Sequence, residues 1–173
     1  MSGRREVHVG LGSNLGDRRA NLAAALEAFP RHPELAGRVE LVRASLAYET
    51  DPVGPPGQGP YLNAAATVRT DLPPERLLAA FLDLERAAGR DRTTEPRNGP
   101  RTLDLDLLLD GATVLDRPGL TLPHPRLRER GFVLIPLTEI APGAIDPVTG
   151  ESVQSLLLRL PSPGRADPIG PLR

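Results

Sequence analysis

The sequence is organised around one stretch, Gly99-Pro-Arg-Thr-Leu-Asp-Leu-Asp-Leu-Leu-Leu-Asp-Gly111, which combines a cation, carboxylates and a run of leucines. Leucines alternate with Asp104 and Asp106, and this two-residue period predicts a β-strand with leucines on one face and both carboxylates on the other. The two Cα atoms would lie roughly 6.5 to 7 Å apart. Mg²⁺ in proteins is commonly bound by one or two carboxylates together with substrate phosphates.

Periodicity alone leaves two interpretations of this strand open, a metal site and an edge strand whose polar face is wet. Leu108 continues the carboxylate face with an apolar side chain, which favours a partly covered face. Unpaired carboxylates on a covered face would be costly without a cation.

The composition bounds the function classes. At 173 residues with a formal net charge of −1, the chain is expected to form one domain and gives no electrostatic reason to bind nucleic acid or an anionic membrane. No apolar run could span a bilayer and the N-terminus lacks a hydrophobic signal core, so we expect a cytoplasmic protein, which we take to be a monomer. Cysteine is absent and all 21 basic residues are Arg. Phosphate chemistry must therefore use Arg, backbone amides and metal.

The order of predicted elements is β-α-β-β-α-β, which indicates an α+β fold with a ferredoxin-like core and an antiparallel sheet. Additional helical segments follow the core, so we expect one domain over residues 1–160 and a Pro- and Gly-rich tail over 161–173 that is extended and dispensable. The core strands are predicted at 7–11, 40–49, 61–69 and from 103, and the core helices after Asp17 and after Asp71. A loop rich in Pro and Gly spans 50–60, a length typical of functional or disordered loops.

Several candidate residues are ambiguous when taken singly. The turn Gly10–Gly16 is one residue too long for G-x-G-x-x-G, and we interpret it as structural. Glu85, late in a helix, would ordinarily be solvated, and His124, between two prolines, would ordinarily be a buried imidazole. The loop 89–101 carries four arginines and, placed directly before the Asp-x-Asp strand, is suited to bind an anion.

Taken together, four motifs resemble the 6-hydroxymethyl-7,8-dihydropterin pyrophosphokinase family of folate biosynthesis. They are Gly12-Ser-Asn-Leu-Gly16, Tyr61-Leu-Asn63, Gly99-Pro-Arg-Thr-Leu-Asp-Leu-Asp106, and Pro123-His124 followed by Arg130-Gly-Phe132. The resemblance implies transfer of the β,γ-pyrophosphoryl unit of ATP to the hydroxymethyl oxygen of the pterin, with release of AMP. ATP and the pterin are the implied partners.

By this resemblance, Asp104 and Asp106 bind two Mg²⁺ ions, and Asp106 is also a candidate general base. Arg90 and Arg101 are the implied phosphate clamp. The implied pterin-binding residues are Thr50, Asp51, Val53, Tyr61, Asn63 and Phe132. A flat heterocycle suits a pair of aromatic faces, and its amide-like edge suits an Asn that can both donate and accept hydrogen bonds.

The implied ATP-binding residues are Glu85, Arg92, Arg101, Leu107, Thr121, His124 and Arg130. The chain also departs from the family pattern. Asn98, Leu82, Gly119 and Pro125 stand where the family has Trp, Gln, Arg and Tyr. These departures concern how the site closes and how adenine is held.

Two other functions share parts of the pattern. An Mg²⁺-dependent nucleotidyltransferase also combines Gly-Ser with Asp-x-Asp, but in that class the two elements lie close in sequence, whereas Ser13 and Asp104 are far apart. An RNA-binding module shares the β-α-β-β-α-β order but needs exposed aromatic residues and a basic surface. Apart from Tyr61, this chain has neither.

Overall fold

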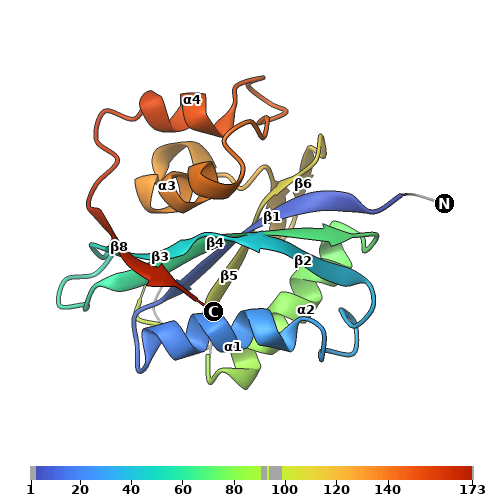
Figure 1. Cartoon of the computed structure of the whole chain (residues 1–173), viewed down its shortest axis with the longest axis horizontal. Helices are drawn as coiled ribbons and strands as arrows, with labels where there is room; N and C mark the ends of the chain where they lie inside the picture. Colours follow the sequence, from blue (N-terminus) through green and yellow to red (C-terminus); the bar gives the residue numbers. More distant parts are fainter. Residues whose placement is uncertain (1–2, 91–92, 94–98, 173) are drawn as a thin grey trace.

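The centre of the molecule is a twisted antiparallel sheet. A computed structural model of the chain describes residues 3–90, 93 and 99–172. The strand order is β5-β1-β4-β3-β8, and β2 also pairs with β4 (Figure 1). The strands are β1 (Arg5–Ser13), β2 (Val39–Ala44), β3 (Leu46–Thr50), β4 (Tyr61–Thr70), β5 (Asp104–Asp110) and β8 (Ala166–Pro171). Neighbouring strands all pair antiparallel, which confirms the predicted α+β fold.

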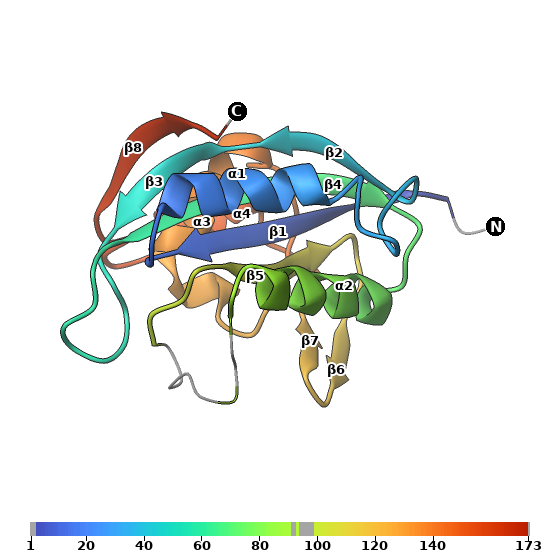
Figure 2. The ribbon, with the colours of Figure 1, turned by 90° about the horizontal axis from the view of Figure 1, so that it is seen from below.

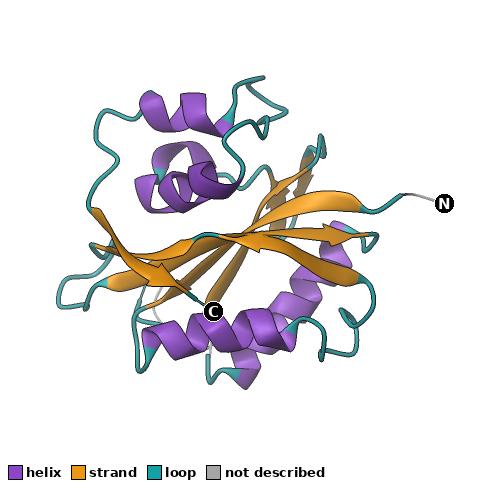
Figure 3. Cartoon of the chain, in the orientation of Figure 1, coloured by secondary structure: helices purple, strands orange, loops and turns teal. Residues whose placement is uncertain are grey.

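Helices cover both faces of the sheet (Figure 3). On one face lie α1 (Arg18–Ala28) and α2 (Pro74–Ala87), and on the other lie α3 (Gly131–Ile140) and α4 (Val153–Leu158). A short 3-10 helix, η1 (Leu127–Glu129), precedes α3, and the hairpin of β6 (Leu115–Arg117) and β7 (Leu120–Leu122) projects away from the sheet (Figure 2). No helix among the described residues combines the length and apolar character needed to cross a membrane.

The helices over the larger core begin where the sequence indicates. Asp17 caps α1, accepting a hydrogen bond of 3.0 Å from the Ala20 N–H, and α2 begins with Pro74, whose missing N–H costs nothing in a first turn. Phe29 and Phe81 stack at 5.5 Å between ring centroids and close the core between α1, α2 and the sheet. These two helices therefore pack on the face of the sheet opposite the face that carries Asp104 and Asp106.

Strand β5 has the predicted two faces. Leu105 and Leu107 are buried in the core against α2, while Asp104 and Asp106 are only partly buried on the other face. The pairing with β1 shifts register beside Leu108, and Leu108 packs into a second apolar cluster with α3 and α4. The carboxylate face is thus partly covered, as Leu108 predicted.

Residues 40–49 form two strands and not the single strand that the sequence predicts. Ser45 separates β2 from β3. It exchanges two hydrogen bonds with Ala65, whose N–H donates to the Ser45 hydroxyl at 2.9 Å and whose carbonyl accepts from the Ser45 N–H at 2.9 Å. A side chain that takes the place of a backbone group interrupts the ladder, which periodicity does not reveal.

The C-terminal segment also differs from the expected free tail. Residues 166–171 are extended, as predicted, but they form β8 on the edge of β3, and Leu172 is buried in the larger core. Pro168 and Pro171 argue against a strand in general, yet an edge strand tolerates proline wherever the N–H would face solvent. The sheet therefore extends past residue 160.

Candidate active site

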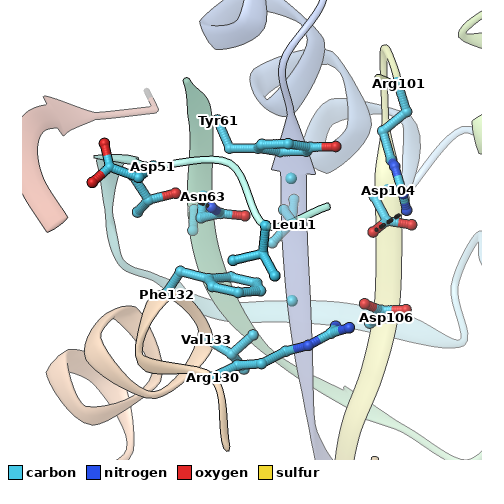
Figure 4. Close-up of a pocket in the computed structure, with 15 residues that line it drawn as sticks. Leu11, Asp51, Tyr61, Asn63, Arg101, Asp104, Asp106, Arg130, Phe132 and Val133 are labelled. Carbon is cyan, nitrogen blue, oxygen red and sulfur yellow. Dashed lines mark hydrogen bonds and ion pairs between the residues drawn. The ribbon is translucent and has the colours of Figure 1, made fainter. Parts of the chain in front are cut away.

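One pocket lies on the carboxylate face of the sheet, beside the first turn of α3 (Figure 4). It brings together residues that are far apart in the sequence, from β1, β3, β4, β5 and α3. The pocket is lined by Gly10, Leu11, Gly12, Thr50, Asp51, Val53, Tyr61, Asn63, Ala64, Arg101, Asp104, Asp106, Arg130, Phe132 and Val133. All six residues predicted for the pterin are among them, together with both aspartates, Arg101 and Arg130.

The two carboxylates lie side by side on β5. Asp104 is held by two guanidinium groups, with Arg101 Nη1 at 3.0 Å from Oδ2 and Arg90 Nη1 at 2.5 Å from Oδ1. Burial, reinforced by the charge of Asp104, raises the pKa of Asp106 to about 7. The described residues contain no group of three His, Cys, Asp or Glu side chains arranged for a metal. Two carboxylates in an open pocket match a hard cation that takes its other ligands from phosphate and water.

Two arginines border the carboxylates. Arg101 is fixed through its backbone, because its N–H donates to Asn14 Oδ1 at 2.7 Å and its carbonyl accepts from the Asn14 N–H at 3.0 Å. Arg130 lies 5.4 Å from the centroid of the Phe132 ring. Its buried Nε has no hydrogen-bond partner among the residues that the structure describes, and a buried donor normally has one. The Arg130 side chain points into the pocket beside Asp106 (Figure 4), where its terminal guanidinium nitrogens are suited to bind an anionic ligand.

The other half of the pocket is aromatic. Tyr61 and Phe132 lie on opposite sides of it, and Asn63 lies between them at the back (Figure 4). The Tyr61 hydroxyl donates to the Gly99 carbonyl at 3.0 Å, and Asn63 Nδ2 donates to Thr50 Oγ1 at 2.7 Å. These bonds fix both side chains, and the Asn63 carbonyl oxygen stays next to Gly12, 2.9 Å from where a Cβ would be. Two aromatic side chains and an amide are groups that suit a flat polar heterocycle.

The first part of the predicted glycine-rich turn is not a turn, because Gly10 and Gly12 lie on strand β1 and line the pocket. Gly10 pairs with Asp106, and Gly12 pairs with Asp104 and with Asn63, so both glycines form the floor of the pocket. Their two-residue spacing on a strand was the signal that places both on one face. The sequence also gave no indication that Leu11, Ala64 and Val133 would line the pocket.

Arg90 and Glu85 are predicted site residues that lie beneath the pocket instead of lining it. Glu85 is 1% exposed, so the solvated interpretation is wrong. Its carboxylate accepts from the Leu105 N–H at 2.8 Å and lies 2.9 Å from Arg90 Nη1. The same Arg90 nitrogen contacts Asp104. Arg90 and Glu85 therefore connect the end of α2 to Asp104 and to the backbone of β5.

Two further residues that the family resemblance assigns to ATP, Leu107 and Thr121, are not among the described residues that line the pocket. Leu107 is buried in the core on the opposite face of β5, and the Thr121 hydroxyl donates to Asp116 at 3.0 Å in the β6–β7 hairpin. Arg92 and Asn98 lie outside the described residues. The structure thus does not bring Leu107 or Thr121 to the pocket wall.

His124 is partly buried next to the pocket. Burial lowers its pKa to about 4, so the ring is neutral at physiological pH. Nδ1 accepts from the Arg126 N–H at 3.1 Å, which assigns the ring proton to Nε2, 3.9 Å from Asp106 Oδ2. The sequence predicts a buried imidazole, and the observed ring is partly buried with Nε2 near Asp106.

Residues 8–142 match the sequence profile of the 7,8-dihydro-6-hydroxymethylpterin-pyrophosphokinase (HPPK) family. The chain belongs to this family. It is 43% identical over 160 residues to 2-amino-4-hydroxy-6-hydroxymethyldihydropteridine pyrophosphokinase of Pseudomonas aeruginosa, covering 92% of this chain and 94% of that one. A Bacillus subtilis protein of the same name is 43% identical over 134 residues, covering 78% of this chain and 77% of that one. Membership in the HPPK family makes the chain an enzyme and outweighs both the nucleotidyltransferase and the RNA-binding interpretation.

A solved structure shares the fold. The HPPK-DHPS protein of Plasmodium falciparum, crystallised with pterin and p-hydroxybenzoate, has a TM-score of 0.69 at 14% identity, over 90% of this chain. The chain spans 43% of that larger protein. The likeness supports an HPPK fold for the sheet and helices that build the pocket.

Proposed function

We propose that the chain transfers pyrophosphate from ATP to the hydroxymethyl group of 6-hydroxymethyl-7,8-dihydropterin and releases AMP. The observation that carries this proposal is a single pocket with an aromatic, amide-lined half and a carboxylate- and arginine-lined half. A pterin bearing a hydroxymethyl group has the same two-part character, a flat heterocycle beside the oxygen that accepts the phosphoryl group. One pocket can therefore hold the acceptor and present it to a polyphosphate.

In the acceptor half, Tyr61 and Phe132 enclose the pterin ring and Asn63 binds its edge. Backbone groups of Thr50, Asp51 and Val53, which also line this half, complete the contacts. Because Thr50 accepts the Asn63 amide hydrogen, the Asn63 oxygen is left to accept a hydrogen bond from the pterin. The hydrogen-bond network of the protein thus selects the orientation of the ring.

In the phosphate half, Asp104 and Asp106 fit Mg²⁺, two ions of which we propose bind with ATP. Bound Mg²⁺ would supply neutralisation of phosphate charge during attack at the β-phosphorus. Arg101 and Arg130 donate to phosphate oxygens, and the Nε2 proton of His124 is directed to the same side. Positioning and charge neutralisation are the main contributions to in-line phosphoryl transfer.

Arg90 acts indirectly, by holding Asp104. Asp106 remains our candidate for accepting the proton of the hydroxymethyl oxygen. Arg92 and Thr121 are proposed for the nucleotide side from the family resemblance alone, whereas Glu85 and Leu107, which are buried and do not line the pocket, are proposed to support β5 without touching ATP. The geometry supports a direct contact with ATP for Arg101 and Arg130, which line the pocket.

Product analysis tests the proposed reaction. The protein is incubated with Mg²⁺, reduced hydroxymethylpterin and ATP labelled at either the α- or the γ-phosphate. We expect the γ label in the pterin product and the α label in free AMP, in equal amounts. Release of inorganic pyrophosphate with the α label on the pterin would show nucleotidyl transfer and overturn the proposal.

Replacing Tyr61 tests the assignment of the two halves. Tyr61→Ala removes one face of the aromatic pair, and we expect the Kd for 6-hydroxymethylpterin to rise about 10- to 100-fold, from lost stacking and burial. The Kd for a non-hydrolysable ATP analogue with Mg²⁺ should change little, as measured by titration. Tyr61→Phe keeps the ring and is the control. A larger loss of affinity for the ATP analogue than for pterin would contradict this assignment.

A further inference from the structure

The C-terminal segment, residues 161–172, contacts two parts of the pterin half although it lies beyond the residues matched by the family profile. We propose that this segment positions the pterin-binding half of the pocket, with Arg165 as its principal positioning residue. The inference rests on the proposed function, because it assigns a role in binding the acceptor. Pairing of strands, a charge network and a close backbone contact support it.

The first support is the pairing of β8 with β3. Strand β3 ends at Thr50, which lines the pocket and receives the hydrogen bond of Asn63. It pairs with β4 only over Tyr48–Thr50, and on its other side β8 pairs with it from Leu46 to Thr50. Without β8, this short strand would be an edge strand held by one short ladder. The position of Thr50 therefore depends on the C-terminal strand.

The second support is a charge network at the pocket rim, formed by Arg18, Glu49, Asp51 and Arg165. Arg165 lies 2.6 Å from Asp167 on β8. It also reaches across to Glu49 at 3.4 Å and to the pocket residue Asp51 at 3.6 Å. From the other side, Arg18 lies 2.9 Å from Glu49 and donates to the Pro60 carbonyl at 2.8 Å. Residues 51–60 form the loop between β3 and Tyr61, so this rim network holds both ends of the loop.

The third support is the close approach of Pro163 to the start of α3. A Cβ on Gly131 would lie 1.8 Å from the Pro163 carbonyl oxygen, so only glycine permits this contact. Gly131 stands between Arg130 and Phe132, both of which line the pocket. The C-terminal segment thus meets the Phe132 wall through Pro163 and the Thr50–Asp51 wall through β8 and Arg165.

The expected effect is selective for the acceptor. Without β8, we expect the pterin-binding half of the pocket to be correctly formed in only a fraction of the molecules at any time. If that fraction falls to about one tenth, the apparent Kd for pterin rises about tenfold. Asp104, Asp106 and Arg101 lie on or next to β5, at the opposite edge of the sheet from β8. The affinity for nucleotide should therefore stay close to that of the wild type.

The test compares Arg165→Ala, Arg165→Lys and a chain ending at Gly164, which keeps Pro163. Arg159→Ala is the matched control, since Arg159 pairs with Glu151 on the exposed surface of the same C-terminal region. Titrations with 6-hydroxymethylpterin and with a non-hydrolysable ATP analogue plus Mg²⁺ are run on each protein, together with thermal unfolding.

We expect the chain ending at Gly164 to lose about tenfold in pterin affinity and Arg165→Ala about two- to fivefold, the range of an exposed ion-pair network. Arg165→Lys should recover most of the loss, and Arg159→Ala should match the wild type. The affinity for the ATP analogue should change less than about twofold in every one of these variants. If the shortened chain fails to fold, the Arg165 pair decides the question.

The positioning role would be overturned if Arg165→Ala left the pterin affinity unchanged, or if it weakened binding of pterin and of the ATP analogue equally. Either result would leave the proposed function intact. Absence of pterin binding by the wild-type protein would overturn the proposed function and this inference with it.

Discussion

Asp104→Asn and Asp106→Asn should each lower the rate of pyrophosphate transfer by about 10³-fold or more, because charge neutralisation by bound metal is worth several kcal/mol in the transition state. Both carboxylates lie on one face of β5 and line the pocket. The amide has the shape of the carboxylate but not its charge, so we expect the substitution to weaken binding of the proposed Mg²⁺ with little change in packing. Steady-state assays at saturating ATP and pterin, over a series of Mg²⁺ concentrations, measure the loss.

The same variants should fold. The two carboxylates repel each other, and replacing one of them removes that repulsion from the metal-free protein. For Asp106→Asn we therefore expect a free energy of unfolding at neutral pH, without Mg²⁺, at or above that of the wild type. Asp83→Asn, at an exposed position on α2, is the control for activity. Near-normal turnover in either variant would refute the proposal that this pair binds the metal.

The face of β5 was predictable because the two-residue period of the leucines and aspartates is a local property of the chain. Asp104 and Asp106 needed only a strand to reach the same side. The glycines opposite them on β1 obey the same period, yet their role as pocket floor depends on which strand pairs with β5. That pairing is a property of the whole sheet, and no single stretch encodes it.

The aromatic half of the pocket was recoverable through the family motifs, since Tyr61, Asn63 and Phe132 each lie in a motif. Periodicity could not have joined Phe132 to Tyr61, because their proximity requires α3 to pack on the polar face of the sheet. Likewise, β8 was hidden by its prolines. Its place on the sheet follows from the free edge of β3, a tertiary feature that composition does not show.

The burial of Arg90 and Glu85 shows where sequence reasoning about charge fails. Both residues looked like surface or ligand-binding groups, because charged side chains are rarely fully buried unless paired. The pairing partner, Asp104, lies on another element, and α2 reaches it only by packing against β5. A buried charge of this kind is therefore invisible until the packing is known.

Glu85→Ala should destabilise the protein strongly, and far more than Asp106→Asn on β5. It leaves the buried Leu105 N–H without its acceptor and removes one carboxylate from the buried Arg90. Breaking a buried ion pair from one side costs about 3–5 kcal/mol, which lowers Tm by roughly 6–20 °C in a chain of this size. Thermal and urea unfolding of the variant measure the change.

Glu85→Gln separates the two contributions, because its side-chain oxygen can still accept from Leu105 while the charge is lost. We expect its Tm to fall between those of Glu85→Ala and the wild type. Glu75→Ala, which removes an exposed carboxylate from the same helix, should change stability by no more than about 0.5 kcal/mol.

These variants also distinguish the buried role of Glu85 from direct contact with ATP. If Glu85 bound the nucleotide, Glu85→Ala would strongly weaken binding of the ATP analogue and leave Tm near that of the wild type. The structure predicts the opposite order, a large fall in Tm with a small change in nucleotide affinity at temperatures where the variant is folded. Turnover should still fall, because Arg90 holds Asp104 at 2.5 Å and its own position depends on Glu85. Loss of rate without loss of nucleotide binding would identify Glu85 as support for β5, the strand that we propose binds Mg²⁺.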